Sequence, residues 1–359
     1  MTQRLRATLL LQPSDITPSQ SGWEVVGVLN PAVTIQGDDV VMLARVAETT
    51  QEQRCGWTAL PRWGCDGTAT VDWVCDEDLE KIDARVVMVR KTGNLRLTSV
   101  SHLQAWRRSL EPEGRWKEAV ALVLPSGATE DYGIEDPRIT KIDDTYWITY
   151  VAVSKFGACT ALMSSRDMIA FERHGIIFPS ENKDVVLFPE KIDGEFVALH
   201  RPNPRSQFSR PQIWIARSSN MIDWGRHEPL FCGSESWEGD RVGSGPPPIL
   251  IDEGWLLLYH GSESSKVAEK VGRYTAGAIL LDRYDPSRVI ARSQRPFMVP
   301  TADFETCGFV PNVVFPTAMF LQGDVLQVYY GAADRCIAMA EFSKRDVLES
   351  MTPRTHSIS

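Results

Sequence analysis

The chain has 359 residues, of which 43% are hydrophobic and 24% are charged, a composition typical of a globular protein with its own core. Acidic residues outnumber basic residues by 47 to 38 and no Lys/Arg-rich run is present, so neither nucleic acid nor an anionic membrane is an expected partner. No apolar stretch approaches the roughly 18 to 20 residues that a membrane helix needs.

The N-terminal segment carries two arginines before a short apolar run at residues 7–11, which Thr8 interrupts and Gln12 follows. This run is too short for the core of a secretory signal peptide. The seven cysteines are an odd number scattered through a large chain, which fits reduced thiols better than a disulfide framework. We therefore expect a cytoplasmic protein. We also expect residues 1–20 to form an N-terminal extension that precedes the main domain.

One unit recurs along the chain, an Asp/Gly turn followed by an apolar and aromatic run that ends in polar residues. Each copy pairs a turn signal with a run rich in Val, Leu, Tyr and Trp, which is typical of a hairpin leading into a buried strand. Helical periodicity is nearly absent, so we expect an all-β protein. The five copies are GDDVVMLARVAE from Gly37, IDDTYWITYVAV from Ile142, IDGEFVALHRPN from Ile192, IDEGWLLLYHGS from Ile251 and QGDVLQVYYGAAD from Gln322.

The spacing of the copies predicts the architecture. A looser unit lies between some of them, as in MSSRDMIAFERHG from Met163 and ARSSNMIDWGRHEP from Ala216, and we expect it to form outer strands of the same module. All-strand modules repeated every 50 to 70 residues or so indicate a β-propeller with about four antiparallel strands in each blade. Five copies predict a five-bladed β-propeller, whereas a β-sandwich would not need the same motif five times.

The longest interval between copies contains RCGWTALPRWGCDGTATVDWVCDEDLEKID without a clean copy of the repeat. We expect an insertion there, at about 50–85, beside the first or second blade and placed to form a loop over the substrate mouth. Cys55, Cys65 and Cys75 lie ten residues apart, which matches no Cys-x-x-Cys pattern, so we expect no metal site. The predicted plan is a single propeller domain (21–345) with this insertion, followed by a C-terminal tail (346–359).

Inner strands of a propeller run beside a central channel, so the polar residues that end the five runs should converge on one pocket. They are Arg45, Tyr150, His200, Arg201, Tyr259, His260, Tyr330 and Asp334. Lys183 and Arg241 lie at or beside strand ends of other modules. Each cation has an ordinary structural alternative, such as an ion pair at the rim or a core histidine bonded to a carbonyl. Converging like charges need an anionic partner, and phosphate suits Arg and Lys.

The acidic pair in the Glu-Asp-Pro-Arg stretch at residues 135–138 precedes the second copy. In isolation, an Asp before Pro is more typical of a turn than of a catalytic site. Adjacent side chains in an extended segment point to opposite sides, so only one of Glu135 and Asp136 should face the pocket. We expect the other to form a structural ion pair with Arg138 or with a neighbouring strand.

The sequence resembles glycoside hydrolase family 130, the β-mannoside phosphorylases and related β-mannosidases, from about residue 27 to residue 342. Each matching stretch is a weak signal by itself, but all of them in this order are specific. The matching stretches are GVLNPAV, GIEDPRITKI, NKDVVLFPEKIDG, LHRP, GSGPPPI, GWLLLYHG, YTAGAILLD, PNVVFPTA and YYGAAD. The resemblance implies a five-bladed propeller, in agreement with the repeat count.

The resemblance also implies roles for individual residues. Asp136 matches the family's catalytic acid, and Asn30, Arg45 and Asp334 match positions that bind the mannosyl unit. The positions that match the phosphate site are Lys183, Arg201, Arg241, His260 and Tyr274. We add Glu135 and His200 as candidate substrate-binding residues. Because the hydrolase branch lacks much of this basic set, its retention favours a phosphorylase.

These roles imply inverting phosphorolysis of a β-mannoside, with inorganic phosphate as co-substrate and no metal or cofactor. Phosphate would attack C1 of the terminal mannose opposite the leaving sugar, giving α-mannose 1-phosphate. Phosphate needs no general base, so one carboxylic acid suffices. In the family this acid is thought to act through the mannose 3-hydroxyl. Asp136 would then hold a proton at neutral pH, which predicts a pKa raised by burial.

Alternatives stay open at this stage. One is an inverting β-mannosidase on the same fold, in which a second acid such as Glu238 or Glu263 activates water. Another is a non-catalytic sugar-binding propeller, and a third is an arabinanase- or fructosidase-like hydrolase, which would need three inward carboxylates and no cations. The sequence does not decide among β-1,2 or β-1,4 manno-oligosaccharides and mannosyl-glucose, nor whether the protein is a homo-oligomer.

Overall fold

The computed structural model describes residues 2–64, 67–111, 114–204, 208–233, 236–263 and 271–353. Within these ranges the chain is all-β, with two short helices, α1 (Asp303–Thr306) and α2 (Lys344–Glu349), and two 3₁₀ turns at Pro13–Asp15 and Asp76–Asp78. None of the helices in the described ranges is long and apolar enough to cross a membrane. Cys65, the middle one of the three evenly spaced cysteines, lies outside the described residues.

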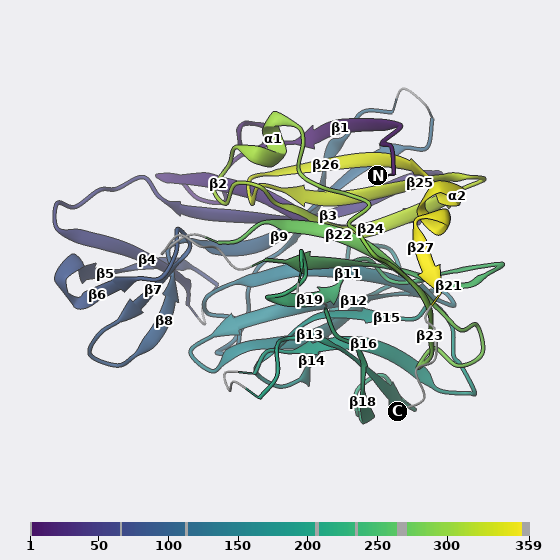
Figure 1. Cartoon of the computed structure of the whole chain (residues 1–359). Helices are drawn as coiled ribbons and strands as arrows, with labels where there is room; N and C mark the ends of the chain where they lie inside the picture. Colours follow the sequence, from purple (N-terminus) through teal and green to yellow (C-terminus); the bar gives the residue numbers. More distant parts are fainter. Residues whose placement is uncertain are drawn as a thin grey trace.

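Most strands belong to five antiparallel sheets, which we call sheets I to V in chain order (Figure 1). Sheet I contains β2 (Trp23–Gln36), β3 (Asp39–Thr50), β9 (Val100–Ser109) and β10 (Lys117–Val123). Sheet II contains β11 (Ile134–Ile142), β12 (Thr145–Ser154), β13 (Gly157–Ser165) and β14 (Glu172–Phe178). Sheet III contains β15 (Asn182–Leu187), β16 (Phe196–Pro202), β17 (Ile213–Ser218) and β18 (Gly225–Phe231).

Sheets IV and V contain the two ends of the chain. Sheet IV contains β19 (Arg241–Ser244), β20 (Ile249–Ile251), β21 (Gly254–Ser262), β22 (Tyr274–Leu281), β23 (Val289–Ser293) and β27 (Met351–Pro353). Sheet V contains β24 (Val314–Gln322), β25 (Val325–Ala332), β26 (Cys336–Ser343) and β1 (Arg6–Leu11). The segment expected as an N-terminal extension therefore supplies the outer strand of sheet V. The expected C-terminal tail likewise continues into α2 and β27, and residues 354–359 lie outside the described ranges.

The five sequence repeats correspond to the second strands of the five sheets, β3, β12, β16, β21 and β25, as the pattern predicts. The turn before β16 shows why Asp and Gly recur there, because Asp193 (φ 53°) and Gly194 (φ 79°) both adopt left-handed backbone. Two-residue hairpins require this conformation, and Asp-Gly tolerates it. Strand β21 is buried at every position, so its residues 255–259 form a continuous apolar and aromatic run instead of alternating.

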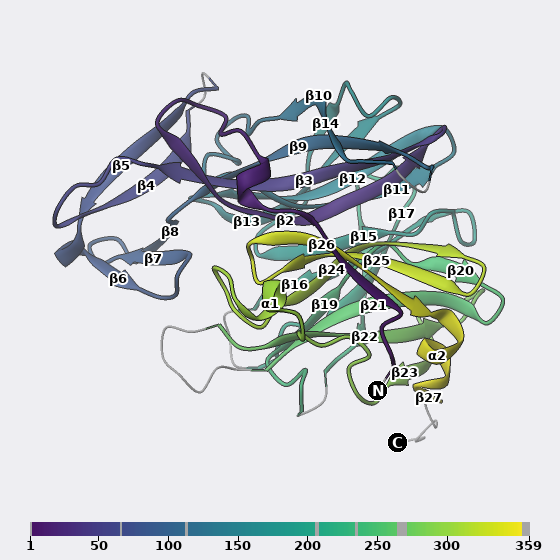
Figure 2. The ribbon, with the colours of Figure 1, turned by 90° about the horizontal axis from the view of Figure 1, so that it is seen from above.

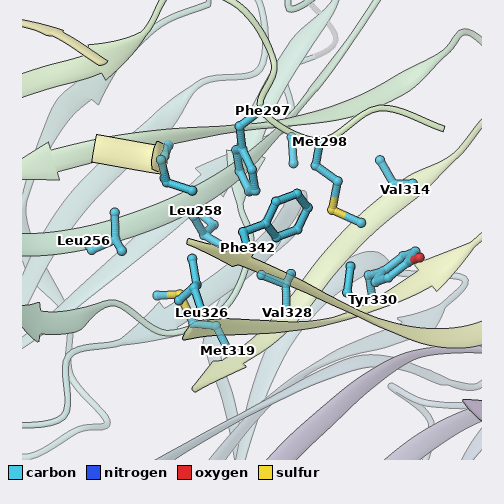
Figure 3. Close-up of a cluster of buried hydrophobic side chains, with 14 of the residues drawn as sticks. Leu256, Leu258, Phe297, Met298, Val314, Met319, Leu326, Val328, Tyr330 and Phe342 are labelled. Carbon is cyan, nitrogen blue, oxygen red and sulfur yellow. The ribbon is translucent and has the colours of Figure 1, made fainter. Parts of the chain in front are cut away.

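Apolar clusters join each sheet to the next. Separate buried clusters connect sheets I and II, II and III, III and IV, and IV and V, and a further cluster connects sheets V and I. In the cluster between sheets IV and V, Leu258, Phe297 and Phe342 pack against Leu326 and Val328 (Figure 3). Each of sheets I to V is thus packed against both of its neighbouring sheets.

Between β3 and β9 the chain leaves sheet I and forms two small sheets that lie at one side of the molecule in both overall views (Figures 1 and 2). One pairs β4 (Trp57–Trp63) with β5 (Ala69–Cys75), and the other contains β6 (Leu79–Lys81), β7 (Val86–Val89) and β8 (Asn94–Leu97). The expected insertion is therefore present, but its strands continue to Leu97, beyond the predicted end at about residue 85.

Three sheets contain the same buried hydrogen-bonded triad. A tyrosine on the second strand donates to a glutamate that precedes the first strand, and an arginine pairs with that glutamate. The triads are Tyr150–Glu130–Arg173, Tyr259–Glu238–Arg292 and Tyr330–Glu305–Arg4. The expectation that these tyrosines converge on the pocket is wrong, because their rings pack between neighbouring sheets.

Candidate active site

A cavity of about 830 Å³ opens where inner strands of all five sheets and the insertion meet. Ten of the eleven site residues expected from the sequence line it, and they come from segments far apart in the chain. They are Asn30, Arg45, Glu135, Asp136, Lys183, Arg201, Arg241, His260, Tyr274 and Asp334. The structure therefore brings nearly the whole predicted set together in one place.

Matching β-bulges direct polar side chains into this cavity from three sheets. The strand register shifts between Leu29 and Ala32, between Glu135 and Arg138, and between Lys183 and Val186. The residue inside each bulge has a left-handed backbone, which Asn and Asp tolerate better than most residues. These residues are Asn30 (φ 46°), Asp136 (φ 49°) and Asp184 (φ 55°).

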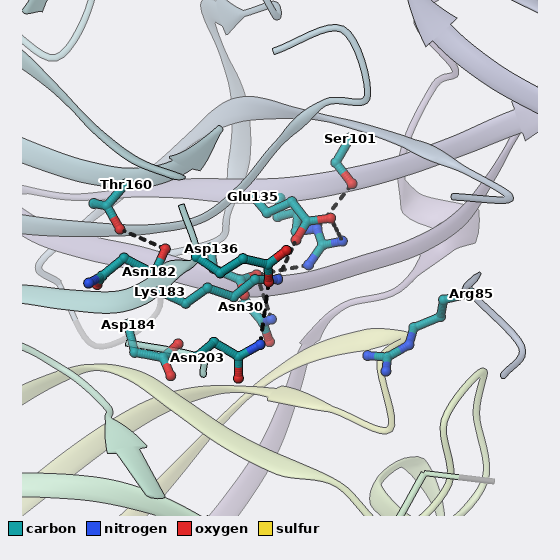
Figure 4. Close-up of polar contacts among 12 residues, drawn as sticks. Asn30, Arg85, Ser101, Glu135, Asp136, Thr160, Asn182, Lys183, Asp184 and Asn203 are labelled. Atoms are coloured by element: carbon teal, nitrogen blue, oxygen red, sulfur yellow. Dashed lines mark hydrogen bonds and ion pairs between the residues drawn. The ribbon is translucent and has the colours of Figure 1, made fainter. Parts of the chain in front are cut away.

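The bulge also corrects the expectation that only one of Glu135 and Asp136 faces the pocket. Strict alternation fails where an extra residue is inserted, so both carboxylates reach the same guanidinium. Arg45 Nη2 donates to Glu135 Oε1 at 2.7 Å, and Arg45 Nη1 donates to Asp136 Oδ1 at 2.9 Å. Asn30 Nδ2 donates to the same Asp136 oxygen at 2.7 Å (Figure 4). Glu135 therefore pairs with a neighbouring strand, not with Arg138.

Arg138 stabilises the bulge at residues 135–138 from the side away from the cavity. Its side chain is buried, with Nε donating to the carbonyl of Gly245 at 2.7 Å and Nη1 donating to the carbonyls of Asp136 and Pro137 at 3.0 and 3.1 Å. These bonds tie the Glu-Asp-Pro-Arg segment to sheet IV. Arg138 thus holds the backbone of the acid in place without facing the cavity.

The expected rise in the pKa of Asp136 is wrong. Burial by itself raises the pKa of this carboxyl, but Arg45, Arg138, the Asn30 hydrogen bond and Lys183 together lower it below its ordinary value. Asp136 is therefore a carboxylate at neutral pH. A catalytic proton on Asp136 requires that ligands first offset these positive charges.

A buried carboxylate organises part of the predicted phosphate site. Asp184 Oδ2 accepts a hydrogen bond from Arg201 Nε at 2.6 Å and lies 3.5 Å from His260 Nε2. Burial raises the pKa of Asp184, but Arg201, His260 and Arg138 outweigh burial and lower it to about 2. This charge fixes the Arg201 guanidinium, whose Nη1 also donates to Asn203 Oδ1 at 3.2 Å.

The histidine of the predicted phosphate site is not a cation. Burial lowers the pKa of His260 to about 3, and although Asp184 raises it, Arg201, Arg138 and Arg241 lower it further. His260 is therefore a neutral imidazole at working pH, and its ring makes tilted contacts with Tyr274 and Phe315 at centroid distances of 5.8 and 4.4 Å. It can donate or accept a hydrogen bond, but it adds no charge.

Two further cations of the set keep partly exposed side chains. Lys183 has 31% of its side chain exposed and lies 3.8 Å from Glu135 Oε2, and Arg241 has 36% exposed and pairs with Asp240 at 2.7 Å. With Arg201 they place three permanent positive charges around one cavity. An anion with several oxygens suits this arrangement.

His200 is the one predicted site residue that does not line the cavity. Its ring is stacked on Phe178 at 4.7 Å, its Nδ1 accepts from Asn182 Nδ2 at 2.9 Å, and its Nε2 lies 3.1 Å from His227 Nδ1. Burial, and then His227, lower its pKa to about 3. The assignment of His200 as a substrate ligand is thus corrected, because it packs between sheets II and III, at the position where other sheets have the tyrosine of the triad.

Sequence reasoning missed Asp184 and Arg85 as site residues. Asp184 carries a recognisable signal, because LNPA, EDPR and KDVV align Asn30, Asp136 and Asp184 at the same place in three repeats. Arg85 carries no such signal. It belongs to the insertion, and its Nη1 donates to Asp334 Oδ2 at 2.9 Å across the cavity mouth.

We expect Gly243→Ala to damage the phosphate site. A Cβ atom at this position would lie 2.2 Å from Asp184 Oδ2 and 2.5 Å from His260 Cε1, so both side chains would have to shift. Overpacking of this kind costs about 1–3 kcal/mol. The Michaelis constant (KM) for phosphate should rise and the melting temperature should fall. Gly225→Ala is the matched control, since nothing lies within 4 Å of its added Cβ; an unchanged KM in Gly243→Ala would contradict this reading.

Comparisons with known proteins agree with the site. Residues 73–353 match glycoside hydrolase family 130, described as β-1,4-mannooligosaccharide phosphorylase. A β-1,2-mannobiose phosphorylase from Listeria innocua is 35% identical over 95% of this chain and 96% of its own. A 1,2-β-oligomannan phosphorylase from Thermoanaerobacter is 40% identical over 60% of this chain and 70% of its own.

A solved structure gives the same result for the fold. The β-1,2-mannobiose phosphorylase of Listeria innocua, in complex with β-1,2-mannobiose, superposes with a TM-score of 0.88 and 34% identity. The match covers 95% of this chain and 96% of the other. Sequence motifs, family match and structure all lead to one assignment, and the chain therefore belongs to glycoside hydrolase family 130.

Proposed function

We propose that the protein is an inverting glycoside phosphorylase that cleaves β-1,2-linked mannosides with inorganic phosphate and releases α-mannose 1-phosphate. The names of its relatives support phosphorolysis, and the names of the Listeria innocua and Thermoanaerobacter relatives described above support the β-1,2 linkage. The observation that carries the proposal is that Asp136 and the permanent cations Lys183, Arg201 and Arg241 line one cavity. The reaction uses phosphate as co-substrate and no cofactor.

In the proposed reaction the cations hold phosphate against C1 of the terminal mannosyl unit, on the face opposite the leaving sugar. A phosphate oxygen forms the new bond to C1 as the glycosidic C1–O bond breaks. Asp136 supplies the proton that the departing oxygen needs, directly or through a sugar hydroxyl. Arg45 and Asn30 keep the Asp136 carboxyl oriented, and the positive charges offset repulsion between phosphate and this acid.

We expect phosphate binding to be coupled to proton uptake. The bound anion would offset Lys183 and the guanidinium groups that lower the pKa of Asp136, so this pKa would rise and the carboxylate would take up a proton. Calorimetric titration with phosphate in buffers of different ionisation enthalpy measures the uptake. Asp136→Asn is the control and should lose it. Equal uptake in the two proteins would assign the proton to another group.

The five sheets are, in this proposal, the five blades of a propeller. The order of contacts between the sheets supports this proposal. Apolar clusters join sheets I to V in succession, and a further cluster joins sheet V back to sheet I. The pairing of β1 with β26 completes the outer edge of sheet V with the N-terminal strand. A central cavity lined by all five sheets is the place where propellers bind their ligands.

The test of the function is incubation with β-1,2-mannobiose in the presence and absence of phosphate. We expect α-mannose 1-phosphate and mannose only when phosphate is present. Release of mannose alone at the same rate without phosphate would indicate a β-mannosidase instead. The two residues named as a possible second acid of a β-mannosidase, Glu238 and Glu263, do not line the cavity. Glu238 instead forms hydrogen bonds with Tyr259 and Arg292.

A further inference from the structure

The insertion between β3 and β9 is a folded unit with its own small core, not an extended loop. Leu60, Leu79 and Val87 are buried together within it. The ion pair between Arg85 and Asp334 fixes it to sheet V at 2.9 Å. On the other side, the Arg96 guanidinium lies 4.5 Å from the centre of the Tyr132 ring, just before β11 of sheet II. The insertion is therefore held against two sheets at the mouth of the cavity.

Strand β8 of this insertion forms part of the cavity wall. Asn94 and its neighbours through Leu97 line the cavity, and the Asn94 side chain is exposed. The turn between β12 and β13 adds Phe156, which also lines the cavity and keeps 56% of its surface exposed. An amide and a partly exposed aromatic ring are side chains that bind the hydroxyls and the apolar face of a pyranose; Lys155 Nζ lies 5.2 Å from the centre of this ring.

This wall is connected to the sheet that carries Asp136. Arg96 of β8 contacts Tyr132, and the backbone N–H of Tyr132 donates to the carbonyl of Val153 at 2.9 Å, close to the Phe156 turn of sheet II. Sheet II also carries Asp136, whereas Arg201 and Arg241 come from sheets III and IV. An inverting displacement places the leaving sugar opposite phosphate and on the side of the acid.

We infer that Asn94 of the insertion and Phe156 of sheet II form the subsite for the leaving sugar. This inference rests on the proposed phosphorolysis and deepens it, since it assigns the sugar released by the reaction to particular side chains. The insertion is then a determinant of which mannoside the enzyme cleaves. Its charged anchor, Arg85 with Asp334, keeps β8 at a fixed distance from the acid.

The reverse reaction separates this subsite from the phosphate site, because the donor α-mannose 1-phosphate and the acceptor mannose are then varied independently. We expect Asn94→Ala and Phe156→Ala each to raise the KM for mannose about 10-fold or more, the usual effect of losing one good contact. The KM for α-mannose 1-phosphate should stay within about twofold of wild type. Phe156→Tyr, which keeps the ring, should retain acceptor binding.

Two variants serve as matched controls. Lys91→Ala changes the same β7–β8 turn without touching the cavity, and Tyr284→Ala removes a ring that is 80% exposed elsewhere on the surface. Both should leave the KM for mannose unchanged. The subsite assignment is wrong if the acceptor KM does not change in Asn94→Ala and Phe156→Ala, or if donor and acceptor KM rise together. A wild-type chain that makes no disaccharide would overturn the proposed function itself.

Discussion

Asp136→Asn should lower turnover on a β-mannobiose by at least the 10²- to 10⁴-fold typical of losing a general acid. Asn keeps the size of the side chain and an oxygen that can accept from Asn30 and Arg45, so the site should keep its shape. The measurement is the phosphate-dependent release of α-mannose 1-phosphate under saturating substrates. The KM for phosphate should fall rather than rise, because the neutral Asn removes a carboxylate charge that repels the anion.

The leaving group distinguishes a lost proton from a damaged site. An aryl β-mannoside with a very acidic phenol departs without protonation, so Asp136→Asn should retain most of its turnover on that substrate. Equal losses on the two substrates would mean that the substitution disturbed Arg45 or Glu135 rather than removing an acid. Near wild-type turnover on mannobiose would show that another residue supplies the proton.

Arg201→Ala should weaken phosphate binding more than mannoside binding. Loss of a charge-assisted contact typically costs about 1.5–3 kcal/mol, which corresponds to a rise of roughly 10- to 150-fold in the KM for phosphate. The same substitution leaves Asp184 buried without its closest partner, at an expected cost of about 3–5 kcal/mol in the free energy of unfolding. Arg173→Ala is the control, since it breaks a partly buried pair with Glu130 away from the cavity.

We expect Arg173→Ala to lower stability while leaving the KM for phosphate unchanged. Equal rises in the KM for phosphate and for mannoside in Arg201→Ala would argue against a dedicated phosphate site.

The pH dependence of the free energy of unfolding gives a second measurement on the Arg201–Asp184 pair. The pKa of Asp184 is about 2 in the folded chain, below its ordinary value, so the pair stabilises the fold above roughly pH 4 and this contribution is lost as pH falls toward 2. The Arg201→Ala variant should show less acid sensitivity in this window.

Much of the fold and site could be predicted from the sequence because one pattern, a turn followed by an apolar strand, occurs five times. Turn residues such as Asp193 and Gly194 must adopt left-handed backbone, and this restricts which residues can occur there. The apolar runs after the turns are buried on both faces, so their positions stand out in the sequence. Repeated units at similar spacing then place ten of the eleven expected residues around one cavity.

Other features depended on contacts between residues distant in sequence. The sequence could not show that His200 packs against Phe178, that Arg85 reaches Asp334, or that the insertion continues to Leu97. It also suggested the wrong direction for the pKa of Asp136, because Arg45, Arg138 and Lys183 come from three different sheets and surround that carboxyl only in the folded chain.

The sequence by itself determined the all-β architecture through its repeated turns and apolar runs, and its resemblance to the family pointed to Asp136 and to most of the basic set. Only the tertiary structure decided that a bulge turns both Glu135 and Asp136 toward Arg45, and that Asp184 holds Arg201 and His260. The physical reason is that electrostatic environment and cavity shape are sums over groups from all five sheets, which no local pattern contains.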